Sequence, residues 1–159
     1  MLFLHGTAIM HHAAARVPRP ERVRQSARRD PSVADFSTSI PAEAAVERAV
    51  AWRQRGADIC YLNSHRAIAD VDFDLAVLSA HQFPAGRVFF RAARETYADV
   101  LRRVRPDVLV EDDCESIGGA SHTVAQALGP ADRIQCVVIP EFGGLAHLPE
   151  DPAHQLLAL

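Results

Sequence analysis

Short apolar runs alternate along this chain with longer segments in which apolar residues recur at helical spacing. The apolar runs have strand length and little polar alternation, which is typical of strands buried on both faces of a parallel sheet. The predicted strands cover residues 1–4, 58–62, 87–90, 108–110 and 134–139. Strands of this kind are joined through helices by right-handed crossovers.

Helices are predicted between the strands, with proline and glycine marking their ends. Pro41 stands where a helix would have its first turn, and Gly56 closes that segment. The other predicted helices cover residues 21–29, 70–83, 95–104 and 121–128. The order of elements predicts an α/β fold, a Rossmann-like three-layer sandwich around a central parallel sheet of about five strands.

Residues 10–40 interrupt this alternation, because they are polar, rich in arginine and proline, and lack a clean period. We expect one domain over residues 1–159, with 10–40 as a flap-like or cap-like excursion. Its arginines could form a mobile basic lid that gathers an anionic ligand or an acidic protein surface, or the segment could be a solvated connection. Residues 155–159 could pack on the body or fray.

Composition narrows the classes of protein further. The chain has 159 residues and a formal net charge of −3, which argues against a nucleic-acid-binding protein. No apolar run reaches the length of a membrane span and no targeting segment is visible, so we expect a cytoplasmic protein with no membrane partner. Three widely spaced cysteines predict buried free thiols in a reducing compartment. A homodimer through an exposed helix face is compatible with such a domain.

In a parallel sheet the ligand site lies past the carboxyl ends of the strands. The residues expected at the site are therefore 5–7, 63–66, 91–94, 111–113 with 115, and 141–144. The acidic triplet Glu111, Asp112 and Asp113 follows one such strand. Adjacent carboxylates repel one another unless a cation is near, and Mg²⁺ prefers carboxylate oxygens, so a divalent ion on Asp112 and Asp113 is one interpretation. A solvated loop, or an acidic cap on the next helix, is the other.

Three segments resemble motifs of the haloacid dehalogenase (HAD) superfamily of phosphohydrolases, in the family's order. Gly6 and Thr7 are similar to the end of its first motif, Asp-x-Asp-Gly-Thr; residues 61–64 are similar to the second, and 106–113 to the fourth. The resemblance spans residues 1–144 and implies a HAD-like fold with at most a minimal cap. The ligand- or phosphate-binding residues that it implies are Gly6, Thr7, Asn63, Ser64, Arg91 and Arg94, with a metal on Asp112 and Asp113.

The chain departs from the family at the catalytic positions. Aligned on Gly6 and Thr7, the nucleophilic aspartate falls on Phe3 and the acid–base aspartate falls on His5. A phenylalanine can neither form an aspartyl-phosphate nor ligate Mg²⁺. The third-motif lysine is missing as well, since the chain has no lysine, although Arg91 or Arg94 could hold a phosphate there.

Two functions are compatible with this pattern. The first is a HAD-like module without catalysis, a binding or regulatory domain for a phosphorylated small molecule or a protein partner. The second is a divergent metal-dependent phosphohydrolase or phosphotransferase that uses His5 with Asp112 and Asp113. Phe3 favours the first; the surviving Ser64 and acidic pair favour the second.

Histidine and cysteine chemistry completes the set of candidates. His5, His11, His12 and His65 follow the first two strands and could converge near the site. His5 together with Asp112 and Asp113 would suit a transition metal better than Mg²⁺, although histidines without any catalytic or metal-binding role remain the alternative. Cys114 is not expected to be a nucleophile, because neighbouring carboxylates raise a thiol pKa.

Overall fold

The structure is a computed structural model, and it describes residues 1–65 and 67–152. Arg66, expected at a strand end, and residues 155–159, expected to pack or fray, lie outside the described residues. No helix in the described part is both long enough and apolar enough to cross a membrane.

A parallel sheet forms the centre of the described part, with the strand order β5-β4-β1-β6-β7. Every neighbouring pair in it is parallel, which confirms the predicted α/β sandwich with a parallel sheet of five strands. The strands are β1 (Leu2–Phe3), β4 (Tyr61–Leu62), β5 (Val88–Phe89), β6 (Val108–Asp112) and β7 (Gln135–Ile139).

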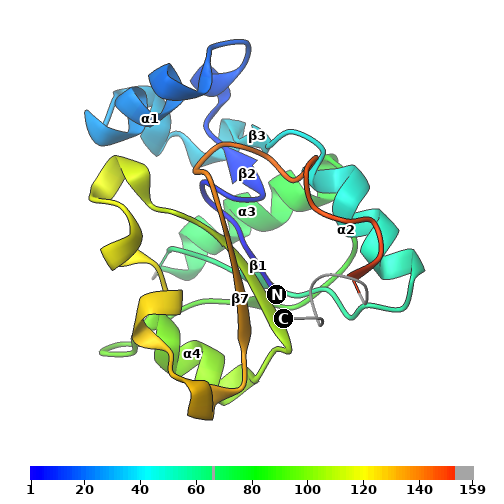
Figure 1. The fold of residues 1–159 in the computed structure, drawn as a ribbon. Coiled ribbons are helices and arrows are strands. Elements are labelled where there is room, and N and C mark those ends of the chain that lie inside the picture. Colours follow the sequence, from blue (N-terminus) through cyan, green and yellow to red (C-terminus); the bar gives the residue numbers. More distant parts are fainter. Residues whose placement is uncertain (66, 153–159) are drawn as a thin grey trace.

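Helices cover both faces of this sheet (Figure 1). One hydrophobic cluster joins Leu2 and Tyr61 to α2 (Ala45–Gln54) and α3 (Ile68–Ala80). A second cluster joins Leu62 and Leu109, on the opposite face, to α4 (Tyr97–Val104). Since successive side chains of a strand point to opposite faces, strands that are apolar throughout require cover on both sides.

The chain order explains where a site can form. β4 and β5 follow β1 on one side, and the chain then crosses to place β6 and β7 on the other side. The order therefore reverses at β1, and such a switch point opens a crevice at the carboxyl ends of the strands. The segments after β1 and β6, which carry the predicted site residues, meet at this crevice.

The excursion over residues 10–40 is more ordered than its composition indicated. It contains α1 (Arg19–Ala27), close to the helix predicted for 21–29, and a small antiparallel pair that was not predicted. This pair joins β2 (Ile9–Met10) to β3 (Ile40–Pro41). The β2–β3 pair lies next to the carboxyl end of β1 (Figure 1), the position expected of a flap over this edge of the sheet.

The prediction that Pro41 lies in the first turn of a helix was wrong. Pro41 belongs to β3, and α2 begins four residues later, at Ala45. The tertiary pairing with Ile9 decides this, and a proline is tolerated at the end of a two-stranded edge because it lacks only a donor. The neighbouring Ala42 amide completes the connection by donating to the Ala8 carbonyl (2.9 Å).

The helix predicted over residues 121–128 was also wrong. Two short 3-10 turns stand there, Ala120–His122 and Ala125–Ala127, separated by an extended Thr123. The amides of Val124 and Ala125 donate to the buried Glu111 carboxylate (2.8 and 2.7 Å). A long-range acceptor thus replaces the intrahelical bonding that local periodicity predicts.

Candidate functional site

A pocket of about 180 Å³ lies at the carboxyl edge of the sheet, where β1 and β6 are neighbours. Its lining includes Phe3, His5, Ser64 and Asp112, which the sequence placed at this edge, together with Glu111 and Cys114. Tyr97, His122 and Glu141 line it as well. The structure therefore brings together the ends of β1, β4 and β6, as the parallel-sheet prediction requires.

The turn after β1 is built around Asp112. The Thr7 hydroxyl donates to one Asp112 carboxylate oxygen (2.9 Å), and the Cys114 amide donates to the other (2.9 Å). Gly6 has φ +85°, and a Cβ there would lie 2.6 Å from Asp112 Oδ2. Only glycine accommodates both the conformation and the close approach. Thr7, which is fully buried, thus holds Asp112 in place rather than facing the pocket.

Phe3 occupies the position where the resemblance places the attacking carboxylate. Its ring lies edge-on to the Tyr97 ring, with 5.1 Å between the ring centroids. It belongs to the hydrophobic cluster beneath α4 and also lines the pocket. The pocket floor at this point is therefore hydrocarbon and offers no nucleophile.

The acidic triplet does not stay together in space. β6 runs to Asp112, two residues further than predicted, so Glu111 and Asp112 point to opposite faces of the sheet. Glu111 receives the two amides that end the 120–128 segment, whereas Asp112 turns to Thr7. Burial raises the pKa of both carboxyls.

A second acidic group forms instead from Asp112, Asp113 and Glu141, whose carboxylate oxygens lie within 4.8 Å of one another. Glu141 was expected at this edge because it follows the last strand, but its grouping with Asp112 and Asp113 was not predicted, since only the sheet order brings β7 beside β6. Its carboxylate accepts hydrogen bonds from the amide and the hydroxyl of Ser116 (both 2.7 Å), and burial raises its pKa. The oxygens of this group could hold a hard divalent cation.

The arginine-rich segment docks on this acidic loop. Arg19, in α1, donates to the Glu141 carbonyl (2.8 Å) and pairs with Glu115 and Asp113. Arg22 donates to the Phe142 carbonyl (3.0 Å). These two arginines are thus used by the chain's own loops after β6 and β7, and their bonds fasten the excursion over the site.

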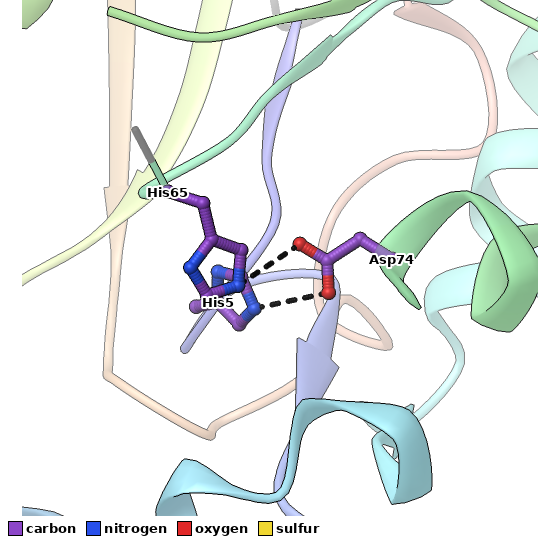
Figure 2. Close-up of side chains that lie close together, drawn as sticks. All are labelled: His5, His65 and Asp74. Carbon is purple, nitrogen blue, oxygen red and sulfur yellow. Dashed lines mark ion pairs between the residues drawn. The ribbon is translucent and has the colours of Figure 1, made fainter. Parts of the chain in front are cut away.

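His5 enters a different cluster from the one expected. Its Nδ1 lies 2.8 Å from the Ser64 hydroxyl oxygen, and its Nε2 lies 3.2 Å from Asp74 Oδ1. The Nε2 of His65 lies 3.5 Å from the other Asp74 oxygen. Figure 2 shows the two imidazoles pointing at one carboxylate from two different strand ends. His5 is thereby coupled to Asp74 on α3.

Asn63 organises this cluster from behind. Its amide nitrogen donates to Asp74 Oδ2 (2.6 Å), and its carbonyl oxygen accepts from the His65 amide (2.8 Å). Asn63 is fully buried and does not line the pocket, so its side chain positions other residues.

Asp74 was missed from the sequence, although a signal was present. The helix 68–80 carries acids at 70, 72 and 74, and two of them are ordinary solvent-side residues. Position 74, however, lies on the same helix face as the buried Val71, Val77 and Leu78. A carboxylate on the apolar face of an amphipathic helix requires a buried polar partner. Here Asn63 donates a hydrogen bond to it, and two imidazoles lie at ion-pair distance.

The other candidate histidines and arginines differ in where they lie relative to the His5 cluster and the pocket. His11 is buried beside Phe142 and contacts Gln25 (3.0 Å), and His12 is exposed, so neither joins the His5 cluster. Arg91 stacks on the Tyr97 ring at 3.9 Å and donates to the Ser64 carbonyl (3.4 Å). Arg94 is exposed and does not line the pocket.

All three cysteines are free, as predicted, but they are half-buried rather than fully buried. Burial, followed by the neighbouring carboxylates of Asp112, Glu111 and Glu141, raises the pKa of Cys114 to about 12. A thiol held this far above neutrality is a poor nucleophile.

No family model, curated protein or solved structure matches this chain. The resemblance to the HAD superfamily therefore depends on the sequence motifs at the ends of β1, β4 and β6.

Proposed function

We propose that this chain is a HAD-like binding domain that holds a phosphorylated small molecule at the carboxyl edge of its sheet without forming an aspartyl-phosphate. The observation that carries the proposal is Phe3. Its ring, packed on Tyr97, lines the pocket where the family's attacking carboxylate would stand. The surrounding frame of parallel strands, flap and strand-end polar residues is otherwise present.

Ser64 and Arg91 are the groups best placed to meet a phosphate. Ser64 has a hydroxyl and lines the pocket. Arg91 is not part of the pocket lining, but it stacks on the pocket residue Tyr97 and donates to the Ser64 carbonyl. A guanidinium that is held flat presents its donors in a fixed direction, which suits phosphate oxygens. Thr7 and Asn63 support this pair indirectly, through Asp112 and Asp74.

The carboxylates of the pocket oppose an unaccompanied anion. Asp112, Asp113 and Glu141 lie on its β6 side, and Arg19 is the cation that pairs with this group among the described residues, through Asp113. A divalent cation such as Mg²⁺ on Asp112 and Asp113 would neutralise this side and bridge to a phosphate oxygen. We therefore expect phosphate to bind more tightly when Mg²⁺ is present.

Calorimetry with inorganic phosphate, with and without Mg²⁺, tests this function on the full chain. We expect saturable binding that strengthens with Mg²⁺ and weakens about tenfold in Ser64→Ala, the cost of one hydrogen bond to a charged group. Ser37→Ala, which removes an exposed hydroxyl paired with Asp35, is the matched control and should bind as the wild type does. Absence of saturable binding under both conditions would refute the proposal.

A second candidate, a hydrolase, is favoured by the geometry around His5. Ser64, His5 and Asp74 form a hydroxyl–imidazole–carboxylate chain with separations of 2.8 and 3.2 Å. In such a chain the imidazole accepts the hydroxyl proton and the buried carboxylate fixes its orientation. This arrangement replaces the expected pairing of His5 with Asp112.

A screen with p-nitrophenyl phosphate and p-nitrophenyl acetate separates the two candidates. Under the binding proposal neither ester is hydrolysed above the rate of the buffer. Turnover that disappears in both His5→Ala and Asp74→Asn, and persists in Asp113→Asn, would establish the hydrolase instead.

A further inference from the structure

The cluster of His5, His65 and Asp74 lies behind the pocket and has features that phosphate binding does not explain. Asp74 is fully buried, and the side chain of His65 is 8% exposed. The Nε2 atoms of His5 and His65, together with Asp74 Oδ1, are buried and have no hydrogen-bond partner among the described residues. Buried polar atoms are rarely left in this state, because each costs the free energy of its lost hydration.

The distances in the cluster are close, yet they do not correspond to hydrogen bonds. His5 Nε2 and His65 Nε2 face the two Asp74 oxygens at 3.2 and 3.5 Å, but neither nitrogen forms a hydrogen bond with them. In a tetrahedral zinc site with bonds of about 2.0–2.1 Å, neighbouring donor atoms are about 3.3 Å apart. The 3.2 Å between His5 Nε2 and Asp74 Oδ1 matches the separation of two ligands of one ion, and His65 Nε2 lies within 4.8 Å of both donors.

We propose that His5, His65 and Asp74 bind a divalent transition-metal ion of the Zn²⁺ class through the two Nε2 atoms and Asp74 Oδ1. One donor from each residue can be chosen so that all lie within 4.8 Å of one another. Two imidazoles and one carboxylate suit a borderline ion, whereas Mg²⁺ requires a shell of oxygens. The site is separate from the acidic group on β6 and does not depend on the proposed phosphate ligand.

Each ligand is held by a group behind it, as metal ligands generally are. The Ser64 hydroxyl lies at His5 Nδ1 (2.8 Å), where it can accept that N–H and leave Nε2 with its lone pair. Asn63 binds the Asp74 oxygen Oδ2 and the His65 backbone. The His5 ring and the Asp74 carboxylate are thus held by side-chain partners before an ion binds, and the His65 ring packs on Phe36.

An aromatic wall closes the site. The Phe36 ring lies edge-on to His65 and His5, with centroid distances of 4.2 and 5.5 Å. A neighbouring cavity of about 180 Å³, lined by Phe36, His5 and Ser64, gives a route by which an ion could enter. The excursion over residues 10–40 thereby supplies a water-excluding cover, which strengthens electrostatic attraction of a cation to Asp74.

The metal site and the Ser64–His5–Asp74 hydrolytic chain require opposite tautomers of His5. A metal on Nε2 places the proton on Nδ1, facing Ser64. The hydrolytic chain places it on Nε2, facing Asp74, and leaves Nδ1 to accept the serine proton. The protonated ring nitrogen of His5 therefore distinguishes the two arrangements directly.

The test uses the full chain, freed of metal by dialysis against a chelator and titrated with Zn²⁺ and with Co²⁺. We expect one equivalent of either ion to bind, with the visible absorption of low-coordinate Co²⁺. Zn²⁺ at about a hundred times its Kd should raise the Tm by roughly 5–10 °C. Nitrogen-15 NMR of the zinc-loaded chain should place the His5 proton on Nδ1.

Variants assign the signal to the cluster. Asp74→Asn and His65→Gln, which nearly preserve side-chain volume, should abolish both the absorption and the Tm shift. Ser64→Ala should weaken binding about tenfold to a hundredfold, as the loss of a group that orients a ligand does. The matched controls are Asp113→Asn, in the acidic group, and His12→Gln, an exposed histidine. Both should bind as the wild type does.

Three results would overturn the proposal. The first is a metal-free wild-type chain that binds neither ion. The second is binding that survives in folded Asp74→Asn and His65→Gln, as judged by circular dichroism, or that disappears in Asp113→Asn instead. The third is a His5 proton that stays on Nε2 in the presence of Zn²⁺. None of these results bears on phosphate binding at the pocket, which is measured separately.

Discussion

Two clusters of ionisable side chains meet at the carboxyl edge of this sheet, and they are built in opposite ways. In the group of Asp112, Asp113 and Glu141, the chain supplies donors to each carboxylate: the Thr7 hydroxyl, main-chain amides, Ser116 and Arg19. In the group of His5, His65 and Asp74, three buried atoms point at one another without a hydrogen bond. The first group therefore needs no ion for its own stability, although its oxygens could still hold one beside a phosphate, whereas the second group leaves buried atoms without a hydrogen bond.

The difference indicates which of the two groups is the better candidate for a metal site. Three adjacent acids in the sequence draw attention to β6, but acids that the protein itself satisfies need no ion for stability. Asp74 is different, because Asn63 donates to its Oδ2 but no described residue donates to its Oδ1. A neutral imidazole that carries its proton on Nδ1 has only a lone pair at Nε2, so it cannot supply that hydrogen bond. Donor satisfaction is therefore a better guide to a metal site than the density of charge along the chain.

Gly6→Ala tests the tightest contact of the acidic group and should have the largest effect. The new Cβ would lie 2.6 Å from Asp112 Oδ2, on a backbone with φ +85°. We expect a loss of about 3 kcal/mol in the free energy of unfolding, from backbone strain and overpacking together. Urea denaturation measures it.

Gly56→Ala is the matched control for that substitution. Gly56 also has a positive φ (+93°), but no atom lies within 4 Å of a Cβ there. It should therefore show the backbone cost alone, about 1 kcal/mol. Equal losses at the two glycines would mean that contact with Asp112 adds nothing.

Thr7→Val removes a donor to buried Asp112 while keeping the shape of the side chain. The Asp112 oxygen Oδ2 then loses its partner at 2.9 Å, and we expect a loss of about 2 kcal/mol. Thr38→Val, which removes an exposed hydroxyl bonded to the Asp35 carbonyl, should change stability by less than about 0.5 kcal/mol. Chemical denaturation of both variants makes the comparison, and a neutral Thr7→Val would show that Asp112 does not depend on this donor.

Ser116→Ala should have a smaller effect on the same group. The Ser116 hydroxyl is one of two donors to Glu141, and its amide (2.7 Å) remains after the substitution. We expect a loss of about 1 kcal/mol, typical of one hydrogen bond whose acceptor keeps another. A loss as large as that of Thr7→Val would show that the bond from the Ser116 amide to the Glu141 carboxylate is lost as well.

His65→Leu, measured in the presence of a chelator, should have the smallest effect and is the sharpest contrast with Thr7→Val. It removes a buried nitrogen that has no hydrogen-bond partner and replaces it with a side chain of similar size. Stability of the metal-free chain should change by no more than about 1 kcal/mol in either direction. A loss above about 3 kcal/mol would instead reveal a strong ion pair between His65 and Asp74.

Much of the fold could be predicted from local pattern. The apolar runs located the five sheet strands, and the helical period located α1, α3 and α4 to within a few residues. These elements were predictable because burial on both faces of a sheet, or on one face of a helix, imposes a repeating order on the sequence. The elements that failed were those decided by distant partners, namely Pro41 paired with Ile9 and residues 121–128 bonded to Glu111.

The candidate site divides in the same manner. Phe3, His5, Ser64 and Asp112 were expected at one edge because parallel strands end together, and all four line the pocket. Asp74 was not expected, since nothing near it in the sequence indicates that α3 approaches the end of β1. Glu141 was expected at this edge, but its grouping with Asp112 and Asp113 was not. Arg94 was expected beside the pocket and lies exposed outside its lining.

The sequence by itself determined the class of fold, the edge at which a site forms and the absence of a carboxylate at position 3, because these follow from periodicity and from the identity of single residues. Tertiary structure alone decided that His5 would face Asp74 and not Asp112, and that each acid would be satisfied or left open. The physical reason is that hydrogen bonds and ion pairs have short range. Which groups come within a few ångströms is fixed by how helices pack on the sheet, and not by their order along the chain.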